Sequence, residues 1–433
     1  MTSRNKSRGW VQVLAVGLLV TAATQLMAAP KVSVEPDHKT ALYEMGESAS
    51  FVIKVTDGEK PVMEGSLSYR VDNFLDVLTA ETSVALAAEG AVVKVSSKKP
   101  QFLRCVATYK PEEGKPIVVV SSVGFAVEKI KPGLPVPDDF DQFWLEQKKN
   151  LAQVKMEVVM KPVAQQEGNL ESFDVQVTCA GGAPVSGYFS RPRDAASKAL
   201  PAILWVHGAG VRSSSLGNSL TGAREGMLSL DINAHGLPNG KPGGFYTAQA
   251  RGPLANYRHD GRSSRDTIYF RGMYLRIVRA IDFLVSQPQW DGKNVIVIGH
   301  SQGGGQSLVA GGIDPRVTTI AVGVPAICDH GGRASGQING WPKIVPYDNN
   351  GQADKKALEA SRYIDAVNFA SRCKAQAIMS VGFVDTVCPP SSCYAAYNLL
   401  QGKKTIINEP KMGHAAPAHI KDAFLKFVKS SLK

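Results

Sequence analysis

Hydrophobic and polar residues change their pattern once along the chain, near residue 129. Before it, short apolar or alternating segments are separated by turn residues such as Asp57-Gly58. These segments cover residues 48–55, 65–71, 91–95, 102–109 and 116–127. Several short strands at this spacing predict a small all-β sandwich of immunoglobulin type over residues 30–128. No catalytic motif falls in it, so a packing or spacer role is favoured over carbohydrate binding.

Residues 129–140, KIKPGLPVPDDF, predict a linker, because Pro132, Pro135 and Pro137 stiffen the chain and block regular structure. After them, apolar runs alternate with helical patterns such as 274–287. The runs cover residues 202–210, 226–236, 294–301, 318–325, 375–385 and 404–410. Continuous apolar strands with helical crossovers predict an α/β fold over residues 129–433, with a doubly wound, mostly parallel sheet. Ligands bind such sheets at the carboxyl ends of the strands.

The first 29 residues have the order of a secretory signal peptide. Arg4, Lys6 and Arg8 precede an apolar run that ends in small residues. A membrane anchor is the alternative, but polar residues such as Gln12 and Thr21 interrupt the run. We therefore expect cleavage, a periplasmic or secreted protein, and no stable membrane insertion afterwards.

Charge and cysteine content narrow the choice of partners. The net charge is +11, and removing the three basic residues of the signal peptide leaves 46 − 38 = +8. The basic residues are spread along the chain, so we expect no nucleic-acid site.

An oxidising compartment permits disulfides among the six cysteines, with Cys388 and Cys393 the nearest candidate pair. No Cys/His spacing indicates zinc, and neither a metal nor another cofactor is expected.

Ser301 is the candidate nucleophile. The segment GHSQG, residues 299–303, fits G-x-S-x-G and follows four β-branched residues, 295–298. A possible helix, residues 302–310, comes next. A strand–serine–helix turn is tight and needs small residues two positions before and after the serine, which Gly299 and Gly303 provide. This context favours a nucleophile over a structural serine.

A serine nucleophile needs a base, and the base needs an acid that orients it. In this fold the order along the chain is serine, acid, histidine. Three histidines follow Ser301: His330, His414 and His419. His414 comes soon after the last strand, where a loop can return to the cleft, whereas His419 falls where the last helix should begin. His414 is the predicted base.

Asp385 is the predicted acid, because it ends the strand predicted at 375–385. Asp329 comes one strand earlier and Asp365 lies in a helical pattern. The oxyanion needs two preorganised donors. We expect them to be the backbone N–H groups of Gln302 and of Ala209 in the loop 207–210, with Gly208 as the alternative to Ala209.

Residues 130–430 resemble the acetyl xylan esterases and cephalosporin-C deacetylases, a carbohydrate-esterase family with the α/β-hydrolase fold. The likeness rests on DDFDQFW (138–144), GHSQGGG (299–305), VDTVCPPSSCYAAYN (384–398) and MGH (412–414). It implies a triad of Ser301, Asp385 and His414, oxyanion donors at Ala209 and Gln302, and metal-free removal of acetyl groups from sugars. We therefore expect an exported serine esterase acting on acetylated sugars such as xylan or xylo-oligosaccharides through an acyl-enzyme.

The sequence departs from this family at two positions near the site. Ala209 stands where an aromatic residue is common, and residues 233–236, NAHG, replace Arg-Gly-Gln-Gly. His235 is therefore a candidate substrate contact. So are Trp341 and Tyr347, in a long segment after residue 324 that we expect to form a wall or lid over the cleft. An oligomer is possible, although the signal peptide and β-domain make the family's intracellular hexamer doubtful.

Two other functions remain open from sequence alone. One is a serine peptidase related to prolyl oligopeptidase, although the N-terminal domain is too short for a propeller. The other is a non-catalytic polysaccharide-binding protein with a decayed esterase domain. A candidate residue for every catalytic role argues against the second.

Overall fold

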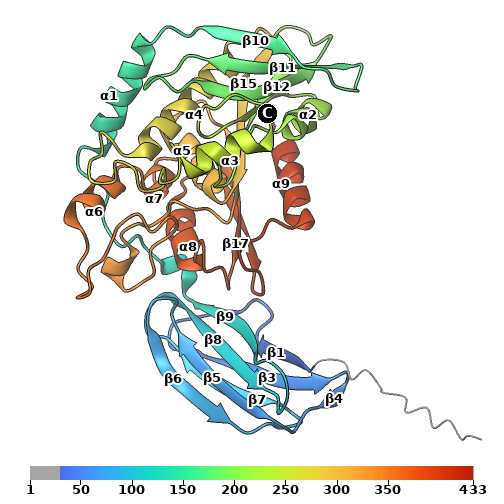
Figure 1. Ribbon diagram of the computed structural model, residues 1–433, viewed down its shortest axis with the longest axis vertical. Coiled ribbons are helices and arrows are strands. Elements are labelled where there is room, and N and C mark those ends of the chain that lie inside the picture. Colours follow the sequence, from blue (N-terminus) through green and yellow to red (C-terminus); the bar gives the residue numbers. More distant parts are fainter. Residues whose placement is uncertain (1–29, 433) are drawn as a thin grey trace, which may run out of the picture.

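The computed structural model describes residues 30–432, and the predicted signal peptide lies outside this range. Residues 31–125 form two facing sheets (Figure 1). One contains β1 (Lys31–Pro36), β3 (Ser48–Asp57), β4 (Lys60–Pro61) and β7 (Ala91–Ser96). The other contains β2 (Leu42–Tyr43), β9 (Ile117–Phe125), β8 (Gln101–Lys110), β5 (Ser66–Asp72) and β6 (Val77–Val84). Alternate residues of β3 are buried, as expected for a strand with one face on a core, so the predicted sandwich is confirmed.

The remaining chain builds a nine-stranded sheet. Its order is β10-β11-β12-β14-β13-β15-β16-β17-β18, and the strands from β14 to β18 are parallel. They are β14 (Leu228–Ile232), β13 (Leu200–Val206), β15 (Trp290–His300), β16 (Thr319–Gly323), β17 (Gln376–Gly382) and β18 (Lys404–Glu409). The apolar runs between residues 202 and 410 thus predicted all the parallel strands. The strand order and the parallel pairing confirm the predicted α/β class with a mostly parallel, doubly wound sheet.

Three antiparallel strands at the other end of the sheet were not predicted. They are β10 (Val158–Pro162), β11 (Leu170–Val177) and β12 (Val185–Pro192). Every residue of β10 is at least partly exposed, and β11 alternates between buried and half-buried positions. Strands that face solvent on one side do not produce the continuous apolar run by which the parallel strands were recognised.

Helices cover both faces of this sheet (Figure 1). The helices α2 (Leu216–Arg224) and α9 (Ala418–Ser431) lie on one face, and α4 (Tyr269–Val285) and α5 (Gln302–Ile313) lie on the other. The other helical elements are η1 (Val127–Lys129), α1 (Phe140–Gln153), α3 (Gly243–Arg251), η2 (Gly332–Ser335), α6 (Lys355–Arg362), α7 (Ala366–Ala370) and α8 (Pro390–Leu399). The helical pattern around Asp365 forms two helices, α6 and α7, because the Asp365 side chain accepts the N–H of Val367 and starts α7.

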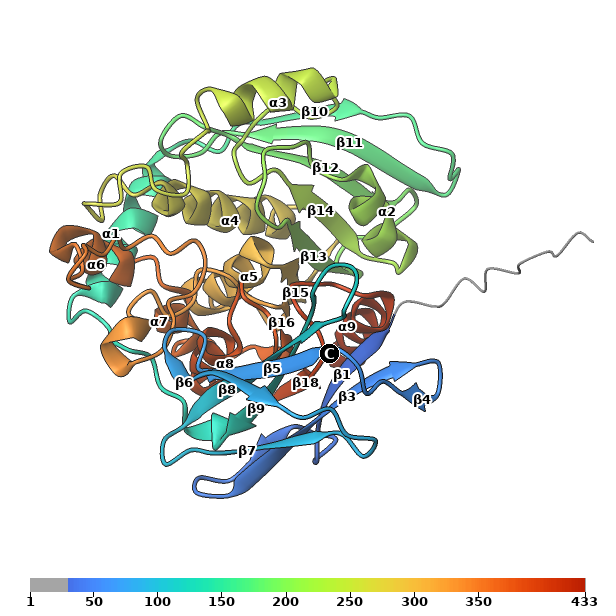
Figure 2. The ribbon, with the colours of Figure 1, turned by 60° about the horizontal axis from the view of Figure 1, so that its bottom comes forward.

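The sandwich packs against α8 (Figure 1 and Figure 2), and its Phe102 packs on Phe383, the residue after β17. Asn398 of α8 donates from its side-chain amide to the carbonyl oxygens of Val127 and Ile130, 2.9 Å in each case. The proline-rich linker is also held, because the Gly133 N–H donates to the Asp329 carboxylate over 2.8 Å. These bonds attach the end of the sandwich and the linker to the hydrolase domain.

All six cysteines are buried free thiols, so the expected pair of Cys388 and Cys393 is not formed. The Cys393 thiol is instead directed at carbonyl oxygens, those of Pro325 and Cys388. None of the helices in residues 30–432 combines the length and apolar character needed to cross a bilayer.

Candidate active site

Ser301 sits at the turn between β15 and α5, with a φ of 58° that a non-glycine residue rarely adopts. The two flanking glycines make this turn possible. A Cβ on Gly299 would lie 2.5 Å from the Val206 carbonyl oxygen, and a Cβ on Gly303 would lie 2.1 Å from it. The G-x-S-x-G spacing therefore reflects a close approach of β13, and it lifts Ser301 to the carboxyl edge of the sheet.

Ser301, His414 and Asp385 form one hydrogen-bonded chain. The Ser301 hydroxyl lies 2.9 Å from His414 Nε2, and His414 Nδ1 lies 2.8 Å from Asp385 Oδ2. The other carboxylate oxygen of Asp385 accepts the N–H groups of Val387 and Cys388, at 2.8 and 2.9 Å. Both oxygens of this fully buried carboxylate are thus fixed, and Oδ2 faces the imidazole. The structure brings together the three residues predicted for catalysis.

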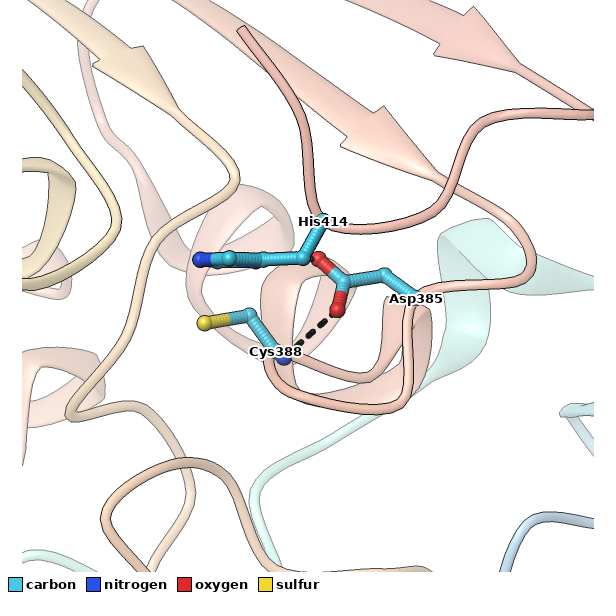
Figure 3. A group of neighbouring side chains, drawn as sticks. All are labelled: Asp385, Cys388 and His414. Carbon is cyan, nitrogen blue, oxygen red and sulfur yellow. Dashed lines mark hydrogen bonds and ion pairs between the residues drawn. The ribbon is translucent and has the colours of Figure 1, made fainter.

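The Cys388 thiol lies beside this chain (Figure 3). One ligand atom each of Asp385, Cys388 and His414 lies within 4.8 Å of the other two. Burial raises the pKa of the Cys388 thiol well above its usual value, so the thiol stays neutral. Both Asp385 oxygens and both His414 nitrogens already have hydrogen-bond partners, so we assign no metal to this group.

The predicted oxyanion donors belong to two segments that meet at the serine turn. Gln302 begins α5, and Ala209 belongs to the loop after β13. Within residues 30–432 neither backbone N–H donates to another group. The loop passes close to the serine, since a Cβ on Gly208 would lie 3.5 Å from Ser301 Cβ. Tyr257 donates from its hydroxyl to the Gln302 side chain over 3.0 Å, a contact that sequence reasoning missed.

The side chains of His207 and His235 make hydrogen bonds to the loop 207–210, which carries the predicted oxyanion donor Ala209. His207 accepts the N–H of Ala234 at Nε2, and its Nδ1 contacts the Gly208 oxygen at 2.6 Å. His235 contacts Tyr269 through Nδ1 (2.7 Å) and the Gly210 oxygen through Nε2 (3.2 Å). Burial lowers the pKa of His207 to about 4 and that of His235 to about 3, so both are neutral.

This geometry corrects the expectation that His235 contacts substrate. His235 is buried and both its ring nitrogens are occupied, so it braces the loop that carries Ala209. His235 follows the strand β14, so the sequence correctly placed it at the carboxyl edge of the sheet. The sequence could not show that its ring would turn into the protein and away from the cleft.

Trp341 and Tyr347 occupy different places in the segment after β16. The Trp341 ring packs edge-on against Phe270, with centroids 6.4 Å apart, and its carbonyl accepts the Ile327 N–H over 2.7 Å. Because Ala326 donates to the Ser301 carbonyl, this places Trp341 close to the serine turn. Tyr347 lines a cavity shared with Leu75 of the sandwich, and its contact with substrate stays a prediction.

The alternative residues considered for the triad lie elsewhere. His419 pairs with Glu409 over 2.7 Å. His330 is fully buried, and neither ring nitrogen has a hydrogen-bond partner in residues 30–432. Asp365 accepts the N–H groups of Asp329 and His330, so this cluster shapes the loop after β16.

The comparisons with known proteins identify the family of the chain. The family model for acetyl xylan esterase matches residues 126–431. The chain is 30% identical to the acetyl esterase Axe7A of Xylanibacter ruminicola over 406 residues, covering 92% of this chain and 90% of that protein.

Solved structures give the same answer. The acetyl xylan esterase from Paenibacillus sp. R4 superposes with a TM-score of 0.62 at 27% identity, covering 71% of this chain and 98% of that one. Acetyl xylan esterase 1 from Thermoanaerobacterium sp. JW/SL YS485 has the same fold, with a TM-score of 0.60 at 24% identity over 71% of this chain and 98% of that one. The chain belongs to the acetyl xylan esterase family.

Proposed function

We propose that this protein is an exported serine esterase that removes acetyl groups from acetylated sugars such as xylan or xylo-oligosaccharides. The hydrogen-bonded chain Ser301–His414–Asp385 carries the proposal. The loop 207–210 approaches Ser301, and no group in residues 30–432 accepts the N–H groups of Ala209 and Gln302. This arrangement supplies a nucleophile, a base, an orienting acid and an oxyanion site. The names of the relatives supply the substrate class.

Catalysis proceeds in two acyl transfers. His414 Nε2 takes the Ser301 proton as the hydroxyl oxygen attacks the ester carbonyl. The negative charge on the tetrahedral oxygen is held by the N–H groups of Ala209 and Gln302. His414 then protonates the departing sugar alcohol, which leaves an acetyl group on Ser301.

Water completes the cycle. His414 removes a proton from the water as it attacks the acetyl-enzyme, and returns this proton to Ser301 as acetate leaves. Asp385 keeps the Nδ1–H of His414 directed away from Ser301 and stabilises the imidazolium that forms in each step. The neutral thiol of Cys388 adds no competing charge beside the imidazole.

The direct test is hydrolysis of p-nitrophenyl acetate, butyrate and octanoate by the mature protein and by Ser301→Ala. We expect the rate to fall from acetate to butyrate to octanoate. We also expect the rate on the acetate ester to drop by about 10⁴-fold or more in the variant. An acetylated xylo-oligosaccharide should release acetate with the same dependence on Ser301. Equal rates in both proteins would contradict the proposal and favour a non-catalytic binding protein. Faster cleavage of peptide amides than of acetyl esters would favour a peptidase.

Export is tested separately. We expect the mature protein, beginning near residue 30, in the periplasm or the medium. A protein that keeps its first 29 residues inside the cell would contradict this part of the proposal without affecting the chemistry.

A further inference from the structure

A cavity of about 450 Å³ lies between α2 and α9, on the face of the sheet opposite α5. Its walls include the end of β13, Gly208, His300, Asn218 of α2 and Phe424 of α9. Gly208 and His300 are neighbours of Ser301 in the fold and in the chain, so the cavity borders the serine turn, although Ser301 itself does not line it. Its volume falls within the range of small-molecule sites, about 300–1,000 Å³.

Aromatic side chains make the floor of this cavity. The indole N–H of Trp205 donates to the Ser229 hydroxyl over 3.1 Å, so the polar group of the ring is satisfied elsewhere. The His300 ring packs edge-on against Phe424, with centroids 5.2 Å apart. Burial lowers the pKa of His300 to about 4, so it carries no charge at neutral pH. The floor is therefore apolar and uncharged, and suits the C–H face of a sugar ring.

Two cations stand over this floor. Arg212 and Lys421 are exposed lining residues, and no acidic residue lines the cavity. Neither cation forms an ion pair within 4.0 Å in residues 30–432, and the buried Asp231 carboxyl interacts with Arg212 only at longer range. Lys429, on the same helix as Lys421, is by contrast paired with Glu225. Arg212 Nη2 donates to the Gly208 oxygen over 3.1 Å, which holds its guanidinium at the end of the cavity near the serine.

We propose that this cavity binds a uronate, a carboxylate-bearing sugar residue next to the acetylated one; this inference rests on the proposed esterase function. The sugar ring lies on the apolar floor and its carboxylate lies between the Arg212 guanidinium and the Lys421 ammonium. A long acyl chain is the competing occupant. It would cover the floor but offer no negative charge to either cation.

The test compares two oligosaccharides of equal length, an acetylated xylo-oligosaccharide with a uronate branch and its neutral acetylated counterpart. The measured quantity is the ratio of kcat/KM for the acidic over the neutral substrate, because a general loss of activity in a variant cancels in the ratio. We expect the wild-type ratio to exceed one and to fall with added salt. Lys421→Gln should lower it about three- to tenfold, and Lys421→Glu should bring it below one. The matched control is Lys426→Gln, an exposed lysine of the same helix that lines a different groove, and its ratio should equal that of wild type.

Each other outcome has a definite meaning. Turnover of the neutral oligosaccharide with a ratio of one in wild type and in Lys421→Gln would overturn the uronate site and leave the esterase function standing. A ratio above one that Lys421→Gln and Lys421→Glu leave unchanged would also overturn the assignment to this cavity. Hydrolysis of p-nitrophenyl octanoate as fast as that of p-nitrophenyl acetate would indicate that the cavity binds an acyl chain and not a uronate. Loss of turnover on both oligosaccharides and on p-nitrophenyl acetate in wild type would instead remove the proposed function itself.

Discussion

Phe102 of the sandwich packs edge to face on Phe383 of the hydrolase domain, with ring centroids 5.0 Å apart and an interplanar angle of 67°. Phe383 stands two residues before Asp385, and both rings are buried. Phe102 also contacts the Tyr394 ring of α8, at 5.7 Å. On the histidine side, Glu35 of the sandwich pairs with Lys411, three residues before His414. The sandwich thus supports both loops that complete the triad.

We therefore expect Phe102→Ala to lower kcat for p-nitrophenyl acetate. Removing a buried phenyl ring leaves a cavity and costs about 3–5 kcal/mol of stability, and here the cavity opens beneath the loop that carries Asp385. The matched control is Phe51→Ala, a fully buried phenylalanine in the other sheet of the sandwich. Both variants should lower the unfolding temperature of the sandwich. Only Phe102→Ala should lower kcat at a temperature where each variant is folded, and equal kcat values would show that the sandwich is a passive attachment.

The serine turn leaves no room for a methyl group, so Gly303→Ala should abolish activity. A Cβ at this position would lie 2.1 Å from the Val206 carbonyl oxygen, which belongs to the central strand β13 and cannot move away alone. We expect loss of labelling by a fluorophosphonate probe, together with a lower unfolding temperature.

Gly413→Ala is the control for this variant. Gly413 immediately precedes His414, yet a Cβ there would meet no atom within 4 Å. It should keep most of the labelling. Normal labelling of Gly303→Ala would mean that the close approach of β13 to the turn does not exist in solution.

The sequence predicted that Ser301, Asp385 and His414 would meet, but it predicted less about the residues around them, for a physical reason. Ser301, Asp385 and His414 follow apolar strands, and parallel strands end at one edge of a sheet, so their meeting follows from chain order alone. The burial of the His235 ring depends on how the loops pack, and the contact of Phe102 with Phe383 depends on how the two domains pack. Neither feature leaves a periodic pattern of apolar residues in the sequence. The free thiols of Cys388 and Cys393 likewise depend on local backbone geometry, which their spacing did not define.

Asp385→Asn should reduce kcat by about 10⁴-fold while leaving the fold intact. The carbonyl oxygen of the introduced amide can still accept the N–H groups of Val387 and Cys388, but its NH₂ group would then face His414 Nδ1. That nitrogen must become an acceptor, so Nε2 carries the proton and cannot take one from Ser301. Steady-state rates on p-nitrophenyl acetate measure the effect. Glu409→Gln, which removes the partner of His419, serves as the control and should retain wild-type kcat.

Asp329 gives the chain a pH-dependent stability whose sign can be worked out. Burial raises the pKa of Asp329 from an ordinary value of 3.8 to about 7, and the adjacent Asp365 carboxyl is the second cause. His330 is neutral, so it adds no positive charge that would offset this shift. Between about pH 4 and 7 the folded protein therefore keeps a proton that the unfolded chain releases. The free energy of unfolding falls as pH rises through this window, by at most about 1.4 kcal/mol per pH unit for one proton.

Asp329→Asn should remove this contribution, because an amide keeps an acceptor for the Gly133 N–H and has no proton to lose. Relative to wild type, the variant should gain stability between pH 4.5 and pH 8, as measured by urea unfolding followed through tryptophan fluorescence. All tryptophans in residues 30–432 lie in the hydrolase domain, so the signal reports on the domain that contains Asp329. Asp422→Asn, at an exposed position of α9, should follow the wild-type pH dependence. If Asp329→Asn also followed it, the carboxyl of Asp329 would have to be ionised in the folded protein across the whole range.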